Sequence, residues 1–342
     1  MISSGMARNL VAAGVAALAA SFGVMDANPS LFLYDRFVCT EDHLRSTFQG
    51  KNIWIVGASS GIGAEMARQL SRHGANLVLS SRPSEKLNSV ANDCQQLGQG
   101  STVVIPLDMT SSDETMEHAV SKVQSILGDR QIDSIVLNAG RGQLAPATAT
   151  SRAQTESMFA VNTIGPIALT TILLSQGLIQ EGKGNHLVVT SSVGAKFGVP
   201  LSSSYASTKH ALHGFYNSLA AENPWMRIDL VCPGPVKTNF HINHQDTGSK
   251  EPKPADTKAP VRELKMPVER CASLIISSMI MGKRGGERWI AEQPTLFGLY
   301  LNQFAPSLFQ LALEKIGPVR LKAFQEGKNL YDPETWRRSN RK

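Results

Sequence analysis

IWIVGASSGIG, residues 53–63, is the stretch that decides the fold: a short apolar run leads directly into a glycine-rich turn, and a helical pattern follows from Ala64 to His73. Glycines allow the turn to be tight and let backbone N–H groups at the helix start approach a pyrophosphate. The spacing GxxxGxG lacks the lysine that a phosphate-binding P-loop carries after its last glycine. Such turns also occur for packing alone, and this alternative stays open. If the turn binds a phosphate, the candidate contacts are Gly57, Ser59, Ser60, Gly61, Ile62 and Gly63.

Outward from this turn, short apolar runs alternate with helical patterns over most of the chain. The runs are IWIV at 53–56, NLVLSS at 76–81, TVVIPL at 102–107, DSIVLN at 133–138, HLVVTS at 186–191, IDLVC at 228–232 and RWIA at 288–291. Connections such as Glu114–Leu127 and Thr155–Gln180 are long enough to cross over and cover a sheet face. The alternation predicts a single α/β domain with a doubly wound parallel sheet of seven strands, a Rossmann fold.

Composition limits the class of protein. The chain has 342 residues, 42% of them hydrophobic and 18% charged, which suits a large buried core and excludes a disordered, collagenous or disulfide-rich chain. The four cysteines are far apart in the sequence: Cys39, Cys94, Cys232 and Cys271. They lack the close spacing of a zinc site or a redox CxxC pair. We therefore expect isolated thiols and no metal.

Positive charge is concentrated at the C-terminus. The formal net charge is +6, and the last seven positions hold four basic residues: Arg337, Arg338, Arg341 and Lys342. The body of the chain is then close to neutral, which argues against a nucleic-acid partner.

Both ends of the chain lie outside the alternating pattern. Leu10–Met25 carries no charge, so residues 1–25 are predicted to be a membrane anchor, a signal peptide or an organellar presequence, with a buried helix as the alternative. Residues 26–50 are predicted to be a linker. Residues 51–292 form the expected cofactor-binding domain, and residues 293–342 an apolar extension with a basic tail.

Two further segments stand out by composition. Residues 241–266 hold three prolines and few large apolar side chains, which indicates a surface insertion, either a lid or a plain loop. Residues 295–313 are uncharged, but Pro306 interrupts them. That interruption favours helices packed on the domain or touching a membrane surface over a membrane span.

The second apolar run ends at a position that selects the cofactor. About twenty residues after the glycine turn, where NAD-binding chains hold an acidic residue, this chain has Ser81 and Arg82. Serine does not repel a ribose 2′-phosphate and arginine attracts it. The pair therefore favours NADP(H) over NAD(H). The alternative is that Arg82 is a solvated side chain in a loop and binds no cofactor.

The strongest chemical signal is YASTK, from Tyr205 to Lys209, whose spacing of four places phenol and ammonium on one face of a helix. Ser192 precedes Tyr205 by thirteen residues, at the end of the fifth run. A free tyrosine has a pKa of about 10 and exchanges protons poorly at neutral pH. An ammonium group about 5 Å away lowers that pKa, so we expect Lys209 to activate Tyr205.

Taken together, these residues resemble the short-chain dehydrogenase/reductase superfamily over about residues 50–290. Asn138, Ala139 and Gly140 resemble its NAG motif, and Asp108 resembles the acid that contacts adenine. PGPVKT at 233–238 resembles the superfamily's loop beside the nicotinamide. This resemblance implies cofactor contacts from four residues: Pro233, Gly234, Val236 and Thr238. Asn162 falls at the fourth catalytic position. For these residues a structural role is the alternative. Asn138 and Asn162 would then bridge backbone strands, and Asp108 would cap a turn.

Two positions depart from the superfamily's usual pattern. Val56 stands where threonine is common before the first glycine, and Leu137 replaces the first asparagine of NNAG. Both missing side chains mainly brace loops by hydrogen bonding. We therefore expect altered stability of the cofactor loops and retained catalysis.

The resemblance implies a reaction in which Tyr205 protonates a carbonyl oxygen that Ser192 polarises, while NADPH provides the hydride. Lys209 is implied to lower the pKa of Tyr205 and bind the nicotinamide ribose, and Asn162 to hold a water that links Lys209 to solvent.

Residues 289–306 and 315–327 resemble a microsomal member of the superfamily. That likeness implies reduction of apolar steroid, retinoid or xenobiotic carbonyls, a role in lipid metabolism, and a place in the endoplasmic reticulum membrane. Another organelle or the secretory pathway is the alternative location. A long-chain lipid reductase of the 3-ketosphinganine or 3-ketoacyl type and a non-catalytic NADP-binding protein are the alternative functions. A homodimer is left open.

Overall fold

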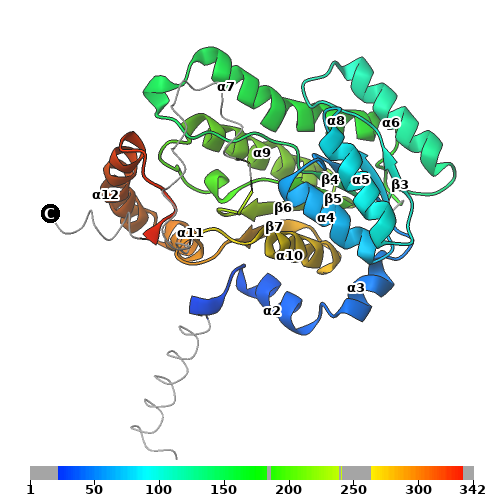
Figure 1. Cartoon of the computed structure of the whole chain (residues 1–342), viewed down its shortest axis with the longest axis horizontal. Coiled ribbons are helices and arrows are strands. Elements are labelled where there is room, and N and C mark those ends of the chain that lie inside the picture. Colours follow the sequence, from blue (N-terminus) through cyan, green and yellow to red (C-terminus); the bar gives the residue numbers. More distant parts are fainter. Residues whose placement is uncertain (1–21, 183–185, 239, 241–262, 334–342) are drawn as a thin grey trace, which may run out of the picture.

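The computed structural model describes residues 22–182, 186–238, 240 and 263–333. Most of the predicted anchor, the proline-rich insertion and the basic tail therefore lie outside the described residues. The described chain forms a sheet covered by helices on both faces, with an additional pair of helices at one end (Figure 1).

The sheet has seven strands in the order β3-β2-β1-β4-β5-β6-β7, and every neighbouring pair is parallel. The strands are β1 (Asn52–Val56), β2 (Asn76–Ser80), β3 (Thr102–Val104), β4 (Ser134–Leu137), β5 (His186–Thr190), β6 (Arg227–Pro233) and β7 (Gly286–Ile290). The predicted doubly wound fold is confirmed. Strand order reverses between β1 and β4, and ligands of such sheets bind at the carboxyl ends of the strands beside this point.

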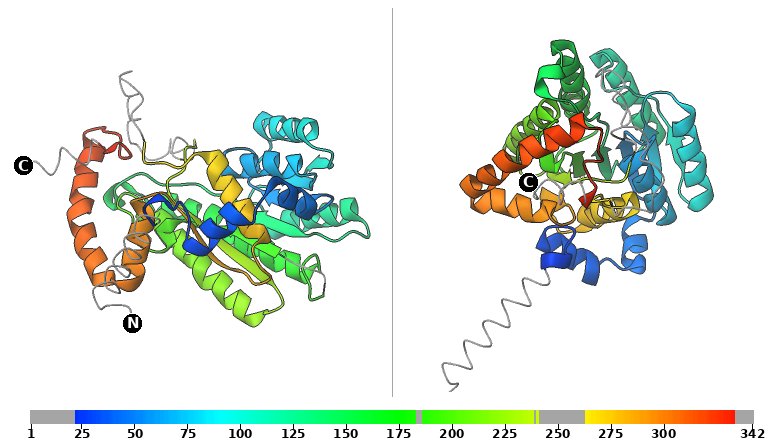
Figure 2. Two further views of the ribbon diagram at one scale, coloured as in Figure 1. Left: turned by 90° about the horizontal axis from the view of Figure 1, so that it is seen from below. Right: turned by 60° about the vertical axis from the view of Figure 1, so that its left-hand side comes forward.

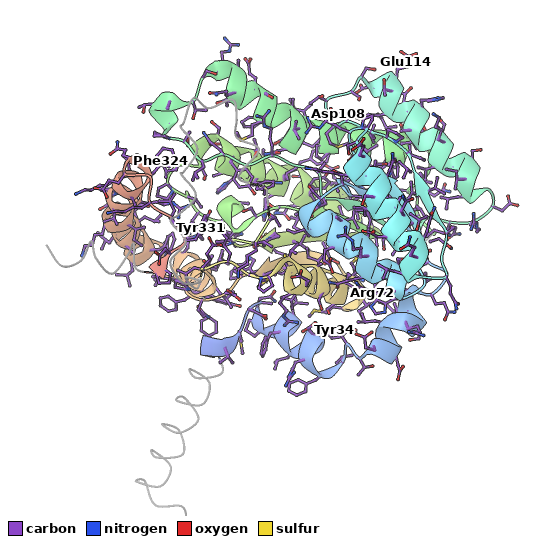
Figure 3. The ribbon with its side chains drawn as sticks, viewed as in Figure 1. Tyr34, Arg72, Asp108, Glu114, Phe324 and Tyr331 are labelled. Carbon is purple, nitrogen blue, oxygen red and sulfur yellow. The ribbon has the colours of Figure 1, made fainter. Side chains whose placement is uncertain are left out.

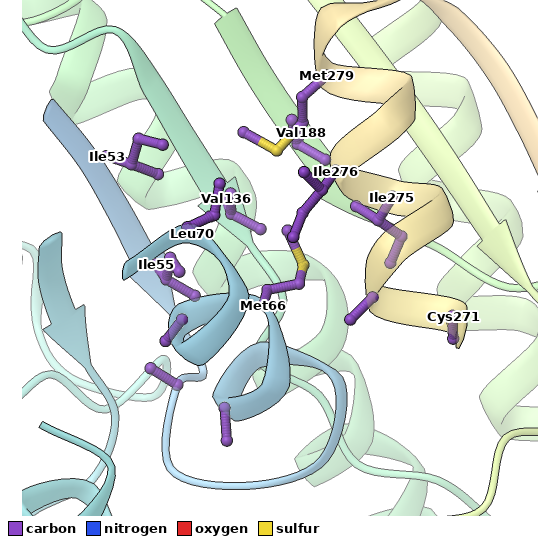
Figure 4. Packing of buried hydrophobic residues seen from close by; sticks show 14 of the residues in the cluster. Ile53, Ile55, Met66, Leu70, Val136, Val188, Cys271, Ile275, Ile276 and Met279 are labelled. Carbon is purple, nitrogen blue, oxygen red and sulfur yellow. The ribbon is translucent and has the colours of Figure 1, made fainter. Parts of the chain in front are cut away.

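One face of the sheet is covered by α4 (Gly61–Arg72), α5 (Glu85–Leu97) and α10 (Val268–Ile280). Figure 4 shows Met66 and Leu70 of α4 meeting Ile276 and Met279 of α10 above the side chains of the central strands. These side chains are fully or almost fully buried. Each such side chain contributes about 1.5–3 kcal/mol by leaving water, so this layer fixes α4, and with it the glycine turn, on the sheet.

The other face is covered by α6 (Asp113–Leu127), α8 (Gly165–Ser175) and α9 (Ser203–Glu222). A continuous helical stretch leads into α8 through α7 (Arg152–Phe159) and the π-helical turn η2 (Ala160–Ile164). Among the described residues, one helix, Arg152–Ser175, is long and apolar enough to cross a membrane, and half of its most apolar window is buried inside the protein. Leu169 and Leu173 lie in the core beneath the sheet, so we interpret this helix as a core element.

The prediction of a linker at residues 26–50 is wrong. This part of the chain forms α2 (Pro29–Phe37) and α3 (Glu41–Phe48), which lie against α10 and the start of β1 (Figure 1). We call residues 26–48 the N-terminal strap. Its helices have nine and eight residues, too few to show a clear apolar period, yet Leu31 is fully buried.

Ion pairs and a sheet bridge hold the N-terminal strap in place. The Arg270 guanidinium on α10 donates to Asp26 and to Asp35, each through a 2.7 Å contact. Ala27 forms an antiparallel bridge with Ile290, so the strap also covers the carboxyl end of the edge strand β7. Long-range contacts of this kind leave no signal in the local sequence.

Residues 295–325 form two helices, α11 (Thr295–Phe304) and α12 (Pro306–Gln325), as the sequence predicted for 295–313. Pro306 occupies the first turn of α12, where its missing N–H costs nothing. Figure 2 shows the two helices at one end of the molecule, outside the layers that cover the sheet. Leu296 and Leu299 of α11 pack on Val193 and Ala291, which lie beyond the ends of β5 and β7.

Candidate active site

The glycine turn after β1 touches the turn after β4. Gly57 has a φ of +94°, and a Cβ placed on it would lie 2.4 Å from the Ala139 backbone nitrogen. A Cβ on Gly63 would lie 2.2 Å from the Gly57 carbonyl oxygen. Asn138 Nδ2 donates to that same carbonyl at 3.0 Å. Gly57 and Gly63 therefore let the two strand ends approach each other, and Asn138 has the bridging role that was the alternative interpretation.

The start of α4 is suited to a phosphate group. Ser60 is the N-cap residue, but its side chain makes no capping hydrogen bond to the first turn, to which Gly61 and Ile62 belong. N–H groups at such a helix start and the helix dipole together favour an anion. Ser59 is half-buried beside them. This cradle fits the pyrophosphate of a dinucleotide.

The segment after β6 closes over the same cradle. Gly234 donates its N–H to Ile290 at 2.7 Å, and Val236 forms a parallel bridge with Met266. The Thr238 methyl group would lie 3.3 Å from a Cβ on Gly61. Of the four residues predicted from PGPVKT, Thr238 thus stands beside the glycine turn, while Gly234 and Val236 pair with Ile290 and Met266.

The residues predicted to bind the adenosine end follow β2 and β3. Ser81 is buried and donates to the Arg82 carbonyl at 2.9 Å, while Arg82 is exposed and forms no ion pair within the described part of the chain. Asp108 Oδ1 accepts from both the N–H and the hydroxyl of Thr110 at 2.9 Å. Asp108 thus caps a turn, and Arg82 remains available to a 2′-phosphate.

Asn162 is fully buried in the π-helical turn and uses its whole amide in protein contacts. Oδ1 accepts from Arg141 N–H at 2.8 Å, and Nδ2 donates to the Arg141 carbonyl and to Thr208 Oγ1. A Cβ on Gly140 would lie 3.3 Å from Asn162 Oδ1 and 3.7 Å from Lys209 Nζ. The structure therefore brings Asn162, Gly140 and Lys209 together, with Asn162 bracing the loop after β4.

Lys209 points from α9 toward the end of β5. Its side chain is buried, Nζ donates to the Thr190 carbonyl at 2.8 Å, and Nζ lies 5.9 Å from the centroid of the Tyr205 ring. Burial lowers the pKa of Lys209 to about 8. The ammonium thus stands beside the phenol, as the spacing of four residues predicted.

Tyr205 lies beside Ser192, the N-cap residue of the short helix η3 (Val193–Ala195), whose hydroxyl lowers the pKa of the phenol. Ser192 Oγ accepts from Gly194 N–H at 3.0 Å, which fixes the hydroxyl. Burial raises the pKa of Tyr205 to about 12, and the Ser192 hydroxyl offsets only part of this effect. The expected net lowering of the Tyr205 pKa is therefore not found, because desolvation of the phenol is the largest effect.

Sequence reasoning missed Gln143. This side chain is almost fully buried, and its Oε1 accepts the backbone N–H of Tyr205 at 3.1 Å. Its carbonyl accepts from Ser202 Oγ at 3.0 Å, just before α9 begins. Gln143 thus holds the first turn of the helix that carries Tyr205, and no motif in the sequence marks it.

Apolar side chains surround the exposed side of Tyr205. The Phe240 ring lies edge-on at 6.0 Å between centroids. Beyond it, the chain after β4, the start of α9 and the C-terminal segment form one cluster: Leu144, Leu201, Ala323, Phe324, Leu330 and Tyr331. Figure 3 shows Phe324 and Tyr331 at the α12 end of the molecule, away from Asp108.

Helices α11 and α12 hold the loop that follows η3. Asn302 Nδ2 donates to the Lys196 carbonyl at 2.9 Å, and the Phe309 ring lies 4.8 Å from the Phe197 ring. The C-terminal helices therefore pack on the loop that follows Ser192 and η3.

Comparisons with known proteins agree with this geometry. The family described as short chain dehydrogenase matches residues 51–248. Dehydrogenase/reductase SDR family member 7 from Mus musculus is 33% identical over 288 residues, covering 82% of this chain and 81% of the mouse protein. The protein of the same name from Homo sapiens is 34% identical, covering 80% of each chain. It is this member of the superfamily that residues 289–306 and 315–327 resemble.

A solved structure shows the same likeness in three dimensions. The alcohol dehydrogenase from the archaeon Thermococcus sibiricus, complexed with 5-hydroxy-NADP, has a TM-score of 0.60 and 26% identity, and the match covers 72% of this chain and 97% of that one. The fold agrees with that of this solved structure. The glycine turn and Ser192, Tyr205 and Lys209 lie within the residues that match the family. The chain belongs to the short-chain dehydrogenase family of oxidoreductases.

Proposed function

We propose that the protein is an NADP(H)-dependent oxidoreductase that interconverts an apolar ketone or aldehyde and its alcohol, of the steroid, retinoid or xenobiotic carbonyl type. The observation that carries this proposal is the position of Tyr205. Its phenol lies beside Ser192 and Lys209, and the Phe240 ring packs edge-on against it.

The raised pKa of Tyr205 suits proton donation. When bound, NADPH supplies hydride to the carbonyl carbon, and the oxygen then needs a proton. An alkoxide is about as basic as hydroxide, whose conjugate acid has a pKa of about 15.7. A phenol with a pKa of about 12 stays protonated at neutral pH and still transfers its proton downhill to such an oxygen. Ser192 Oγ orients the same oxygen.

Lys209 has a second role beside the phenol. Its buried Nζ keeps two donor positions besides the bond to the Thr190 carbonyl. We assign these to a ribose hydroxyl of the cofactor and to the electrostatic stabilisation of the phenolate that proton transfer leaves behind. Asn162, through its bonds to Arg141 and Thr208, holds the loop that faces Lys209.

Arg82 supports the choice of NADP(H). Its exposed guanidinium follows β2, at the adenosine end of the cradle, and the archaeal neighbour was solved with 5-hydroxy-NADP. A charge-assisted bond to the 2′-phosphate fits both observations. Ser81 beside it carries no negative charge that would oppose the phosphate.

The cluster around Tyr205 supports an apolar substrate. Phe240, Leu144, Leu201 and Phe324 offer aromatic and aliphatic surface and no charge. The test is NADPH oxidation by the full chain, measured against three panels: steroid and retinoid carbonyls, small xenobiotic ketones and aldehydes, and long-chain 3-keto lipids. Turnover confined to the lipid panel would replace this proposal with the lipid-reductase alternative. NADPH binding without turnover on any panel would favour the non-catalytic one.

We further propose that the protein associates with the endoplasmic reticulum membrane through residues 1–25. Large apolar side chains on α11 and α12 are exposed, among them Phe304 at 78% and Leu308 at 59%. Such a surface suits contact with a bilayer. Arg8, which precedes the uncharged segment Leu10–Met25, favours a catalytic domain in the lumen by the positive-inside tendency. Release of the full-length protein by alkaline extraction of microsomes would exclude the anchor, and digestion of Tyr205-containing fragments in sealed microsomes would reverse the topology.

A further inference from the structure

Four side chains that the reaction does not use meet next to Ser192. His213 of α9 places Nε2 3.0 Å from Ser191 Oγ, and its Nδ1 lies 3.2 Å from Glu287 Oε2 on β7. His213 and Ser191 are 8% and 3% exposed. Cys232 Sγ on β6 is 3.6 Å from the same Nε2 and is fully buried. The imidazole thus connects the helix that carries Tyr205 to the carboxyl ends of β5 and β6 and to the beginning of β7, where Glu287 is the second residue.

The charges around His213 fix its hydrogen bonds. Glu287 also accepts from Lys196 Nζ at 3.0 Å and from the Trp289 indole, and these donors lower the pKa of Glu287 to about 2 although burial opposes them. Glu287 is therefore a carboxylate and only accepts. It follows that His213 Nδ1 carries a proton and that, in the neutral ring, Nε2 accepts the Ser191 hydroxyl. This tautomer is assigned from the partners.

His213 and Lys209 tie α9 to Thr190, the last residue of β5, and to Ser191, which follows it. Lys209 Nζ donates to the Thr190 carbonyl at 2.8 Å, and His213 bonds Ser191, the next residue. Tyr205, Lys209 and His213 follow one another at intervals of four, so they share one face of the helix. Ser192 comes directly after Ser191, which means that the His213 bond constrains the separation between Ser192 and Tyr205.

We propose that His213, oriented by the Glu287 carboxylate, is a positioning residue that fixes the end of β5, and with it Ser192, against the helix that carries Tyr205. The proposal deepens the proposed reductase function and rests on it. His213 reaches the reacting atoms only through Ser191 and the backbone of Ser192. A misplacement of about 1 Å in such a site costs up to about 100-fold in rate.

The kinetic test uses the full chain and three variants of one position. His213→Leu removes both bonds, His213→Asn keeps the donor toward Glu287, and His213→Gln keeps the acceptor toward Ser191. We expect His213→Leu to lower kcat about 10- to 100-fold, with the dissociation constant of NADPH unchanged, and His213→Gln to recover more of kcat than His213→Asn. The matched control is His210→Leu, one turn earlier, whose ring bonds only its own helix at the Ala206 carbonyl.

A double-mutant cycle separates positioning from loss of stability. Ser191→Ala removes the same bond from the other side, so the double variant with His213→Leu is expected to be no slower than the slower single variant. The proposal would be overturned if the double variant lost kcat by the product of the two single losses. It would also be overturned if His213→Leu lowered kcat and NADPH affinity equally. The pH dependence of alcohol oxidation adds a readout: a displaced Ser192 no longer lowers the Tyr205 pKa, so the rise in rate moves to higher pH. Glu287, Lys196, Cys232 and Lys209 are the titratable groups around His213 and are unchanged in these variants.

Amide hydrogen exchange tests the positioning role of His213 without any need for turnover, so it applies even if the protein reduces no carbonyl. In the cofactor-free protein, His213→Leu is expected to accelerate amide exchange at residues 191–195, where Ser191 N–H bonds the Val231 carbonyl and Gly194 N–H bonds Ser192 Oγ. His210→Leu is expected to leave this segment unchanged. Unaltered exchange at 191–195 in His213→Leu would refute the positioning role. An inactive wild type with accelerated exchange in the variant would refute the reductase function alone.

Discussion

Replacing Lys209 with methionine is expected to stabilise the fold at neutral pH while it removes activity. Burial lowers the pKa of Lys209 from 10.5 to about 8, so the charged side chain costs the folded state about 3 kcal/mol at pH 7, at about 1.36 kcal/mol per pKa unit. Methionine has nearly the same length and carries no charge. It gives up the bond to the Thr190 carbonyl, worth about 1 kcal/mol. The net expected gain is about 2 kcal/mol.

The sign of this effect depends on pH. The folded protein holds the Lys209 proton less tightly than the unfolded chain does, so wild-type stability rises as the pH goes from about 8 to 10.5. The variant lacks that rise. Its advantage of about 2 kcal/mol at pH 7 is therefore expected to fall to about zero near pH 10.

Urea unfolding of the cofactor-free full chain at both pH values measures this difference. Lys122→Met, which changes an exposed lysine of α6, is the control and is expected to shift stability by less than about 0.5 kcal/mol at both pH values. Should Lys209→Met be less stable than wild type at pH 7, or differ from it equally at both pH values, the buried charge would not carry the cost assigned to it.

Three further outcomes follow from the site and the strap. Tyr205→Phe is expected to lower kcat by about 10²–10⁴-fold with unchanged NADPH affinity, and retention of more than about a tenth of wild-type kcat would remove Tyr205 from its role. Arg82→Ala is expected to weaken NADPH binding about tenfold or more and leave NADH binding nearly unchanged, as measured by titration; equal losses would indicate loop damage. Leu31→Ala, at a fully buried position of the N-terminal strap, is expected to cost about 2–5 kcal/mol, whereas Leu33→Ala, at a position 48% exposed on the same helix, is expected to cost less than about 0.5 kcal/mol.

Local patterns were enough to predict the fold and to single out Tyr205 and Lys209, which the structure places beside each other. The apolar runs have four to six residues and overlap the seven strands, and the glycine turn and the YASTK spacing are contiguous in sequence. The N-terminal strap was missed because its helices are short and gain their stability from Arg270 and α10, more than 200 residues away.

The protonation chemistry of the site was harder to predict from the sequence than the residues that form it. The pKa of Tyr205 depends on how far tertiary packing removes the phenol from water, and the spacing to Lys209 contains no information on that. Gln143 and His213 act through partners on other elements. Residues of this kind become visible only when the strand ends are assembled.

The N-terminal strap also sets the order in which the protein can be completed during synthesis. Asp26 lies 244 positions before its partner Arg270, and a ribosome adds about 5–20 residues per second. The strap therefore emerges roughly 12–50 s before α10 exists at that speed. During this interval α2 lacks α10, the helix on which it packs, so Leu31 is expected to reach its buried position only after most of the chain has been made.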